Sequence, residues 1–160
     1  MRTCVYPGSF DPITSGHLDI ISRIVDMFDR VLVTVLNNST KLSFFSVEEK
    51  LDFLRKSTAG YSNVVAGYHD GLLVDFAKAN SARFIVRGLR AISDFELELQ
   101  MASLNKKLYP SAEMVFLMTS TDYSFVSSKM VREIGSLGGN LQTLVPDAIL
   151  EDVTGRLRVI

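Results

Sequence analysis

Short apolar runs alternate with segments of helical periodicity along almost the whole of this 160-residue chain. The clearest run, Val31 to Leu36, is apolar nearly without a break, as expected for a parallel strand covered on both faces. The other strand-like runs are Thr3–Tyr6, Val64–Tyr68, Phe84–Arg87 and Val115–Met118. Because parallel strands need crossover helices between them, the alternation predicts an α/β fold with a doubly wound, five-stranded parallel sheet and helices on both faces.

The segments between the apolar runs show helical spacing or helix-start signals. Ser46 followed by Glu49 forms a capping box that predicts the start of a helix reaching Leu54. Apolar residues spaced three and four apart predict helices elsewhere. Two of the predicted helices are marked by apolar stripes, one at Ile21, Ile24, Val25 and Phe28 and the other at Ile92, Phe95, Leu99 and Ala102. The other two are a short helix Leu73–Ala79 and a helix from Val126 to Ile134, which Gly138 and Gly139 end. The tail from Pro146 is expected to hold a short helix and an extended end.

The composition favours a single globular domain over residues 1–160. Hydrophobic residues make up 47% and charged residues 22%, and the formal net charge is −1. This balance gives no electrostatic reason to expect nucleic acid or an anionic membrane as a partner. Two histidines and one cysteine make a zinc site of the usual kind improbable, and no predicted metal ligand is named. The lone Cys4, with no signal peptide and no run long enough to span a bilayer, favours a cytoplasmic protein.

Small and polar residues are concentrated between the first predicted strand and the first predicted helix. The segment Tyr6 to His17 reads Tyr-Pro-Gly-Ser-Phe-Asp-Pro-Ile-Thr-Ser-Gly-His. At this position of an α/β sheet, helix N–H groups bind phosphate, and Ser9, Thr14 and His17 can each direct a polar atom at an anion. Turn chemistry alone could account for each residue singly. The complete ordered segment predicts a phosphate site.

Polar and cationic residues also follow three other predicted strands. Lys41 follows the second strand, Arg87 and Arg90 follow the fourth, and a hydroxyl-rich segment from Tyr123 to Lys129 follows the fifth. Surface ion pairs, a simple helix cap at Ser127 or a solvated loop lysine could explain each feature alone. Four strand ends that bring donors and positive charge together favour an anionic ligand. The glycine-rich dinucleotide motif, the P-loop and the hydrolase serine elbow are all missing from the sequence.

Three ordered blocks together resemble one family, the bacterial phosphopantetheine adenylyltransferases of the nucleotidylyltransferase superfamily. They are the opening segment, the Arg-Gly-Leu-Arg block of residues 87–90 with its continuation to Met101, and the segment Tyr123 to Ser128. The resemblance covers nearly the whole chain. It implies a Rossmann-like fold and transfer of the adenylyl group of ATP to 4′-phosphopantetheine, which gives dephospho-coenzyme A and pyrophosphate with Mg²⁺ as cofactor. It also implies a homohexamer and feedback inhibition by coenzyme A.

The resemblance implies a role for each matching residue. His17 would stabilise the transition state at the ATP phosphates, and the catalytic group would also include Lys41, Arg90 and Ser128. Residues expected to hold phosphopantetheine are Ser9, Lys41, Leu73 and Arg87. Residues expected to hold ATP are Ser9, Phe10, His17, Gly88, Leu89, Arg90, Glu98, Tyr123, Ser124, Phe125, Val126, Ser127, Ser128 and Lys129. One departure is Lys129, which stands where many relatives carry a third serine.

Two other functions are compatible with parts of the sequence. Another small nucleotidylyltransferase with a different phosphorylated acceptor would share the phosphate motifs. A catalytically silent nucleotide-binding module would need to have lost a catalytic donor, whereas the expected donors are all present. Release of pyrophosphate that depends on the acceptor separates these three possibilities.

Overall fold

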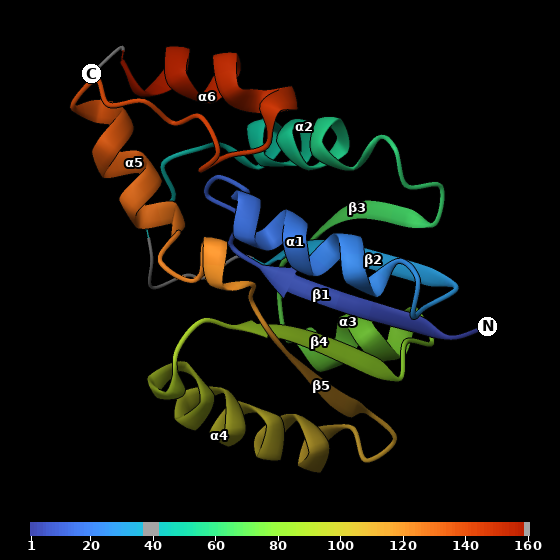
Figure 1. Cartoon of the computed structure of the whole chain (residues 1–160). Helices are drawn as coiled ribbons and strands as arrows, with labels where there is room; N and C mark the ends of the chain where they lie inside the picture. Colours follow the sequence, from blue (N-terminus) through green and yellow to red (C-terminus); the bar gives the residue numbers. More distant parts are fainter. Residues whose placement is uncertain (37–41, 159–160) are drawn as a thin grey trace.

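The computed structural model describes residues 1–36 and 42–158, and its centre is a five-stranded parallel sheet (Figure 1). The strands lie in the order β3-β2-β1-β4-β5. Their bounds are β1 Thr3–Gly8, β2 Arg30–Leu36, β3 Val64–His69, β4 Phe84–Leu89 and β5 Glu113–Met118. All five predicted strands are confirmed. From β1 the chain places β2 and β3 on one side of β1, and it then crosses over to place β4 and β5 on the other side. This change of direction makes the space between β1 and β4 a topological switch point.

Helices occupy the crossovers, as the doubly wound prediction requires. Their bounds are α1 Ser15–Ile24, α2 Val47–Thr58, α3 Leu73–Ala79, α4 Ile92–Leu108, α5 Ser128–Ser136 and α6 Leu150–Leu157, with 3₁₀ turns at Thr121–Tyr123 and Asp147–Ile149. The predicted α3 and the capping box of α2 are confirmed. Phe28 was expected on the α1 stripe but lies beyond its end, and α5 begins at Ser128 rather than Val126. The predicted helix in the tail is α6, and the chain end lies outside the described residues.

Side chains of β1 alternate between two apolar cores, one on each face of the sheet. Cys4 and Tyr6 belong to a large core that also contains buried residues of α1, α2, α5 and α6. Val5 points to the opposite face, where it packs with Leu32, Ile85 and residues of α3. Both faces of the sheet are therefore covered by helices, which accounts for the nearly unbroken apolar character of the strands.

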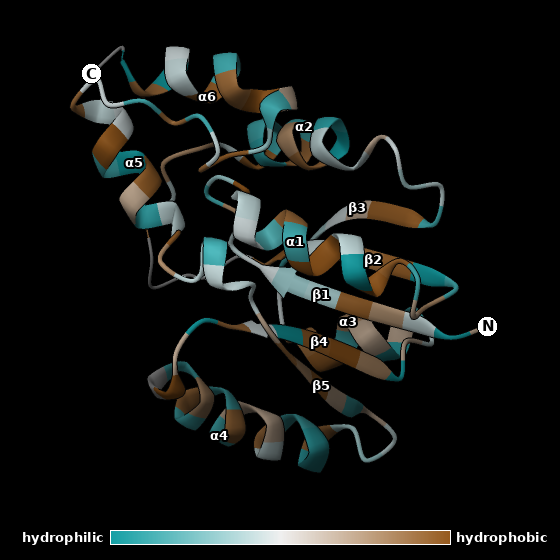
Figure 2. Ribbon diagram, viewed as in Figure 1, coloured by the Kyte–Doolittle hydropathy of each residue, from teal (hydrophilic) through white to brown (hydrophobic). Residues whose placement is uncertain are grey.

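Helix α4 was expected to bury an apolar stripe, and most of that stripe is exposed. Ala102 is buried, but Ile92 is 85% exposed, and Phe95 and Leu99 are also exposed. The one ring contact of this stripe with the sheet joins Phe95 to Phe116 of β5. Figure 2 shows apolar and polar residues interspersed along the length of α4. Neither α4 nor any other helix among the described residues is long and apolar enough to cross a membrane.

Candidate active site

The switch point between β1 and β4 opens into a cavity of about 340 Å³, which we call the β1–β4 cavity. It lies where the β1–α1 segment, the end of β4 and the start of α5 come together. Nine residues predicted to bind ligands line it, namely Ser9, His17, Arg87, Gly88, Arg90, Glu98, Val126, Ser127 and Ser128. Residues separated by more than 100 positions in the sequence therefore meet in one place, because parallel strands present their carboxyl ends at the same edge of the sheet.

His17 is held at the start of α1 by a reciprocal capping arrangement. The His17 backbone N–H donates to the Thr14 hydroxyl at 3.3 Å, and the Thr14 backbone N–H donates to Nδ1 of His17 at 3.0 Å. Because a backbone N–H can only donate, Nδ1 must accept. The proton of a neutral imidazole is therefore on Nε2, where it is available as a donor to a ligand.

Burial and positive neighbours keep the His17 imidazole neutral. Burial, together with the positive charges of Arg90 and Arg87, lowers the pKa of His17 to about 4. The ring of Phe10 contacts the imidazole edge-on, with 5.0 Å between the centroids. Phe10 is buried and has a left-handed backbone (φ 43°), which a residue with a side chain rarely adopts. This strained residue helps to fix the ring orientation of a neutral donor.

The two arginines of the β1–β4 cavity are both balanced by carboxylates. Arg87 donates to both carboxylate oxygens of Glu98, at 2.8 and 2.6 Å, and to the Pro7 carbonyl oxygen at 3.0 Å. Arg90 lies 3.7 Å from the carboxylate of Asp94. The alternative of a surface ion pair therefore holds for Arg90, whereas the partner of Arg87 is Glu98 and that pair is partly buried.

Helix α5 contributes its N-terminus to the same cavity. The Ser127 hydroxyl accepts from the Met130 backbone N–H, which makes Ser127 the N-cap. The Ser128 hydroxyl donates to the Pro12 carbonyl oxygen at 2.8 Å, and Arg90 donates to the Val126 carbonyl oxygen at 3.3 Å. These bonds join the end of β4, the β1–α1 segment and α5, and they direct the positive end of the α5 dipole toward the cavity.

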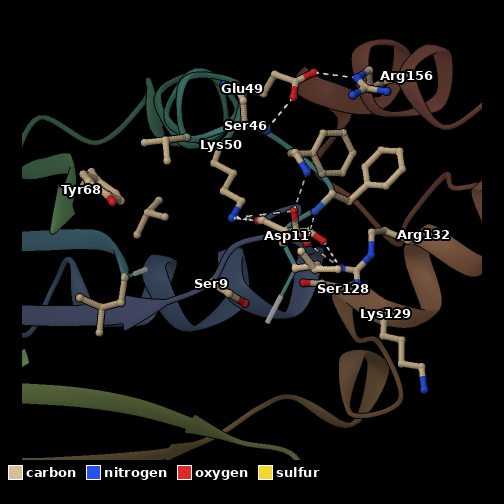
Figure 3. A pocket seen from close by; sticks show the side chains of 17 residues that line it. Ser9, Asp11, Ser46, Glu49, Lys50, Tyr68, Ser128, Lys129, Arg132 and Arg156 are labelled. Atoms are coloured by element: carbon tan, nitrogen blue, oxygen red, sulfur yellow. Dashed lines mark hydrogen bonds and ion pairs between the residues drawn. The ribbon is translucent and has the colours of Figure 1, made fainter. Parts of the chain in front are cut away.

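A second cavity of about 550 Å³, the Asp11 cavity, adjoins the first (Figure 3). Asp11 is buried, and its carboxylate accepts from the backbone N–H groups of Phe44 and Phe45 at 3.0 and 2.9 Å. Arg132 of α5 lies 3.2 Å from the carboxylate and Lys50 of α2 lies 3.9 Å from it. Asp11 therefore joins three separate segments behind the segment that is predicted to bind phosphate.

The remaining predicted residues do not line the β1–β4 cavity, although Phe10 contacts His17. Lys129 lines the Asp11 cavity instead. Leu73 packs against the second core, and Leu89 is buried in β4. Tyr123, Ser124 and Phe125 line neither of the two cavities, and Phe125 is 60% exposed. Lys41 lies outside the described residues.

Comparison with known proteins identifies the family of this chain. The sequence model of the cytidylyltransferase-like family matches residues 5–134. The chain is 50% identical over 151 residues to a phosphopantetheine adenylyltransferase from Caldanaerobacter subterraneus subsp. tengcongensis, with 94% of each chain covered. It is 48% identical over 157 residues to that of Clostridium novyi, with 98% of each covered. This chain belongs to the phosphopantetheine adenylyltransferase family.

The same fold also occurs in a more distant protein. A solved structure from Vibrio parahaemolyticus, assigned as a nicotinate-nucleotide adenylyltransferase, superimposes with a TM-score of 0.68 at 17% identity. The alignment covers 98% of this chain and 96% of that one. At this identity the likeness concerns the fold alone, and it supports the predicted Rossmann-like architecture.

Sequence reasoning missed the buried charges of the Asp11 cavity. For Asp11 the sequence indicated turn chemistry only as an alternative and no role of its own, and Lys50 and Arg132 were not singled out. One signal was available for Lys50, which precedes Phe53 and Leu54 by three and four positions and so shares their buried face of α2. A lysine on an apolar face needs a partner, which here is Asp11.

Within residues 1–36 and 42–158 no group of three or more His, Cys, Asp or Glu side chains could hold a metal ion. The carboxylates that line the two cavities among the described residues are each paired with a lysine or an arginine. Such walls suit a Mg²⁺ ion that arrives bound to phosphate oxygens and water rather than one held by protein carboxylates.

Proposed function

We propose that this protein transfers the adenylyl group of ATP to 4′-phosphopantetheine and releases dephospho-coenzyme A and pyrophosphate. The observation that carries the proposal is His17, a neutral imidazole that lines a cavity with two guanidiniums at the sheet switch point and whose Nδ1 accepts the Thr14 backbone N–H. The relatives support the choice of acceptor, since phosphopantetheine adenylyltransferases about 50% identical to this chain align along nearly its full length.

The reaction is an in-line displacement at the α-phosphorus of ATP. A phosphate oxygen of the acceptor is already anionic at neutral pH, so it needs no general base. The bond to the α,β-bridging oxygen breaks, and its electron pair leaves with pyrophosphate. Nε2–H of His17 donates to the α-phosphate as charge develops on it, and Arg90 and the N-terminus of α5 stabilise the adjoining phosphates. Holding both substrates in register contributes roughly 7–11 kcal/mol to lowering the barrier.

For the acceptor, we propose that Lys41, Leu73 and Arg87 bind phosphopantetheine and that Ser9 lies between the two substrates. Ser9 lines both the β1–β4 cavity and the Asp11 cavity, which supports a place at their junction. Arg87 lies at the carboxyl end of β4 with its guanidinium fixed by Glu98. A guanidinium held in this way keeps one orientation, as recognition of a phosphate requires.

We further propose Mg²⁺ as the cofactor. Ser9, Ser128 and the α5 N-terminus would receive the phosphates that carry it, since these groups offer hydroxyls and N–H donors but no carboxylate cluster. When bound, Mg²⁺ offsets part of the triphosphate charge. The protein's own groups would orient the triphosphate and supply the remaining positive charge.

The proposed assembly is a homohexamer, with coenzyme A as a feedback inhibitor and the cytoplasm as the location. The exposed apolar residues of α4, which include Ile92, Leu97 and Leu104, support self-association because such side chains gain most from burial against another chain. Cys4 is buried and unpaired, which is compatible with a reducing compartment.

The test is release of pyrophosphate from ATP and Mg²⁺ with and without 4′-phosphopantetheine. We expect release only with the acceptor, together with dephospho-coenzyme A as product. Release with a different phosphorylated acceptor alone would mean another nucleotidylyltransferase activity. Saturable ATP binding without release, whatever the acceptor, would mean a silent nucleotide-binding module.

A further inference from the structure

One part of the wall of the β1–β4 cavity is the segment of residues 119–126, which connects β5 to the N-cap of α5. Thr119 and Val126, at its two ends, line the cavity. The hydrogen bonds inside the segment are local turns, such as those from the Tyr123 N–H to the Ser120 carbonyl oxygen at 2.9 Å and from the Val126 N–H to the Tyr123 carbonyl oxygen at 3.0 Å. These turns shape the 119–126 segment, but they do not place it against the cavity.

Two of the hydrogen-bonded links that place this segment lead to the end of β4. The Thr119 N–H donates to the Leu89 carbonyl oxygen at 2.8 Å. At the other end of the segment, Arg90 donates to the Val126 carbonyl oxygen at 3.3 Å. Neither of these links involves residues 120–125.

The third link is made by Asp19 of α1, whose carboxylate holds Ser120 with both oxygens. The Ser120 backbone N–H donates to one oxygen at 3.1 Å, and the Ser120 hydroxyl donates to the other at 2.7 Å. Arg23, one turn further along α1, lies 3.4 Å from the same carboxylate and donates to the Met118 carbonyl oxygen at 2.7 Å. Among the described residues, no other hydrogen bond joins residues 120–125 to another part of the chain.

Asp19 is placed to act on the cavity through this segment rather than by touching a ligand. Its side chain is only 13% exposed, and it lines neither the β1–β4 cavity nor the Asp11 cavity. A carboxylate that is mostly buried requires partners, and Ser120 and Arg23 supply them. Because the contact uses two charge-assisted hydrogen bonds, it fixes both the position and the direction of Ser120.

Helix α1 carries both Asp19 and His17, so this link also sets the segment relative to the proposed catalytic group. The first turn of the helix packs against the same segment, since a Cβ added at Gly16 would lie 3.5 Å from carbon atoms of Thr119 and of Tyr123. We propose that Asp19 is a positioning residue for the nucleotide, which fixes the segment relative to His17 so that this wall of the cavity is formed before ATP binds. The identity of the ligand rests on the proposed function.

A cavity wall that is formed in advance raises the affinity for the nucleotide. Without Asp19, the 119–126 segment would be linked only at its ends and would sample arrangements that do not complete the cavity. ATP would then bind only the fraction of molecules in which the segment is in place, and the apparent affinity would fall by this fraction. The effect should fall on ATP, because the groups proposed to bind 4′-phosphopantetheine belong to other elements.

The test is binding of ATP with Mg²⁺ to the full chain by isothermal titration calorimetry, without an acceptor so that no transfer occurs. Asp19→Ala removes the link, and Ser120→Ala removes only the hydroxyl bond. In Asp19→Asn the amide oxygen can accept the Ser120 N–H and the amide nitrogen can donate to the Ser120 hydroxyl, so both bonds are kept while the charge is lost. The double variant of Asp19→Ala with Ser120→Ala measures whether the two residues act together.

The matched control is Asp29→Ala. The Asp29 carboxylate also accepts a backbone N–H, that of Arg2, but this contact lies at the opposite edge of the sheet, where β1 and β2 begin. Asp29 lines neither cavity. For every variant, binding of 4′-phosphopantetheine and the free energy of unfolding in urea are measured in parallel.

We expect Asp19→Ala to weaken ATP binding about tenfold or more and Ser120→Ala to weaken it about threefold. The double variant should bind ATP like Asp19→Ala, because the hydroxyl has already lost its partner. Asp19→Asn should stay within about twofold of the wild type, and Asp29→Ala should bind ATP like the wild type. Affinity for 4′-phosphopantetheine should stay within twofold throughout. Ser120→Ala removes one hydroxyl from a half-buried position, so it tests the proposal even if Asp19→Ala unfolds.

Three results would overturn the proposal. ATP affinity within twofold of the wild type in both Asp19→Ala and Ser120→Ala, together with a lower free energy of unfolding, would make Asp19 a purely structural link. A loss in Asp19→Asn as large as in Asp19→Ala would mean that the charge acts rather than the hydrogen bonds. A loss that falls on 4′-phosphopantetheine would place the segment at the acceptor. Failure of the proposed function would be recognised separately, as a lack of dephospho-coenzyme A formation by wild-type protein that binds ATP.

Discussion

Replacing His17 with alanine tests the central feature of the proposed mechanism. The substitution removes the Nε2–H donor, and losing one preorganised donor to a developing oxyanion costs about 10²–10³ in kcat, or about 2.7–4 kcal/mol. It also removes the acceptor of the Thr14 backbone N–H at the start of α1. Loss of a capping interaction costs about 0.5–2 kcal/mol in the free energy of unfolding. We therefore expect a folded, somewhat less stable protein with nearly normal ATP affinity and very low turnover.

The assay follows pyrophosphate release at saturating ATP and 4′-phosphopantetheine, with ATP affinity measured separately by calorimetry. The matched control is His69→Ala, because this second histidine lies on β3, contacts Phe76 and lines neither cavity. The control should keep its kcat within a few-fold. If His17→Ala also kept its kcat within a few-fold, the role of His17 in the transition state would be wrong. If instead ATP affinity fell while kcat at saturating substrates stayed unchanged, His17 would bind the ground state and the transition state equally.

Three further predictions concern the acceptor, the guanidinium and pH. Lys41→Ala should raise the KM for 4′-phosphopantetheine more than the KM for ATP, and an unchanged acceptor KM would exclude its assigned role. Arg87→Lys cannot keep both bonds to Glu98, so we expect a KM for the acceptor at least tenfold higher in steady-state assays. Because the folded pKa of His17 (about 4) lies below its ordinary value of 6.5, the unfolded chain binds more protons between these pH values. In urea titrations, the wild type should therefore lose stability relative to His17→Ala as pH falls from 6.5 to 4.

The parts of the fold that were predicted well are those where local chemistry and tertiary packing agree. The capping box of Ser46 and Glu49 forms as its sequence requires, with bonds of 2.7 and 3.1 Å. Phe28 shows where local periodicity was insufficient. It continues the spacing of Ile21 and Ile24 and is buried, but the chain has already left the helix. A buried position is compatible with either backbone, so spacing alone could not place the helix end.

In helix α4 the apolar residues did not predict which side of the helix would be buried. Apolar residues occur at almost every angle around this helix, so selecting Ile92, Phe95, Leu99 and Ala102 gave an apparent stripe with no unique direction. The sequence could not indicate which side would face the sheet. Burial of Ala102 and Asn105 shows that the small and polar positions approach the rest of the chain most closely.

Much of the β1–β4 cavity could be predicted because its residues lie in contiguous motifs at strand ends. The Asp11 cavity could not, because its charges belong to three elements that are adjacent only after folding. Asp11, Lys50 and Arg132 are separated by 39 and then 82 positions, and each is an ordinary residue in its own segment. A buried charge becomes recognisable only when the partner that compensates it is known.

The neutral state of His17 can be understood from what the proposed mechanism requires. A protonated histidine beside the α-phosphorus would attract the triphosphate of bound ATP as strongly as the transition state, and such uniform binding lowers KM without raising kcat. Burial and the two nearby guanidiniums prevent this by keeping His17 uncharged, so in the proposed mechanism it acts through one directed N–H. A neutral donor directed at the α-phosphate interacts most strongly as negative charge develops there, which favours the transition state over bound ATP.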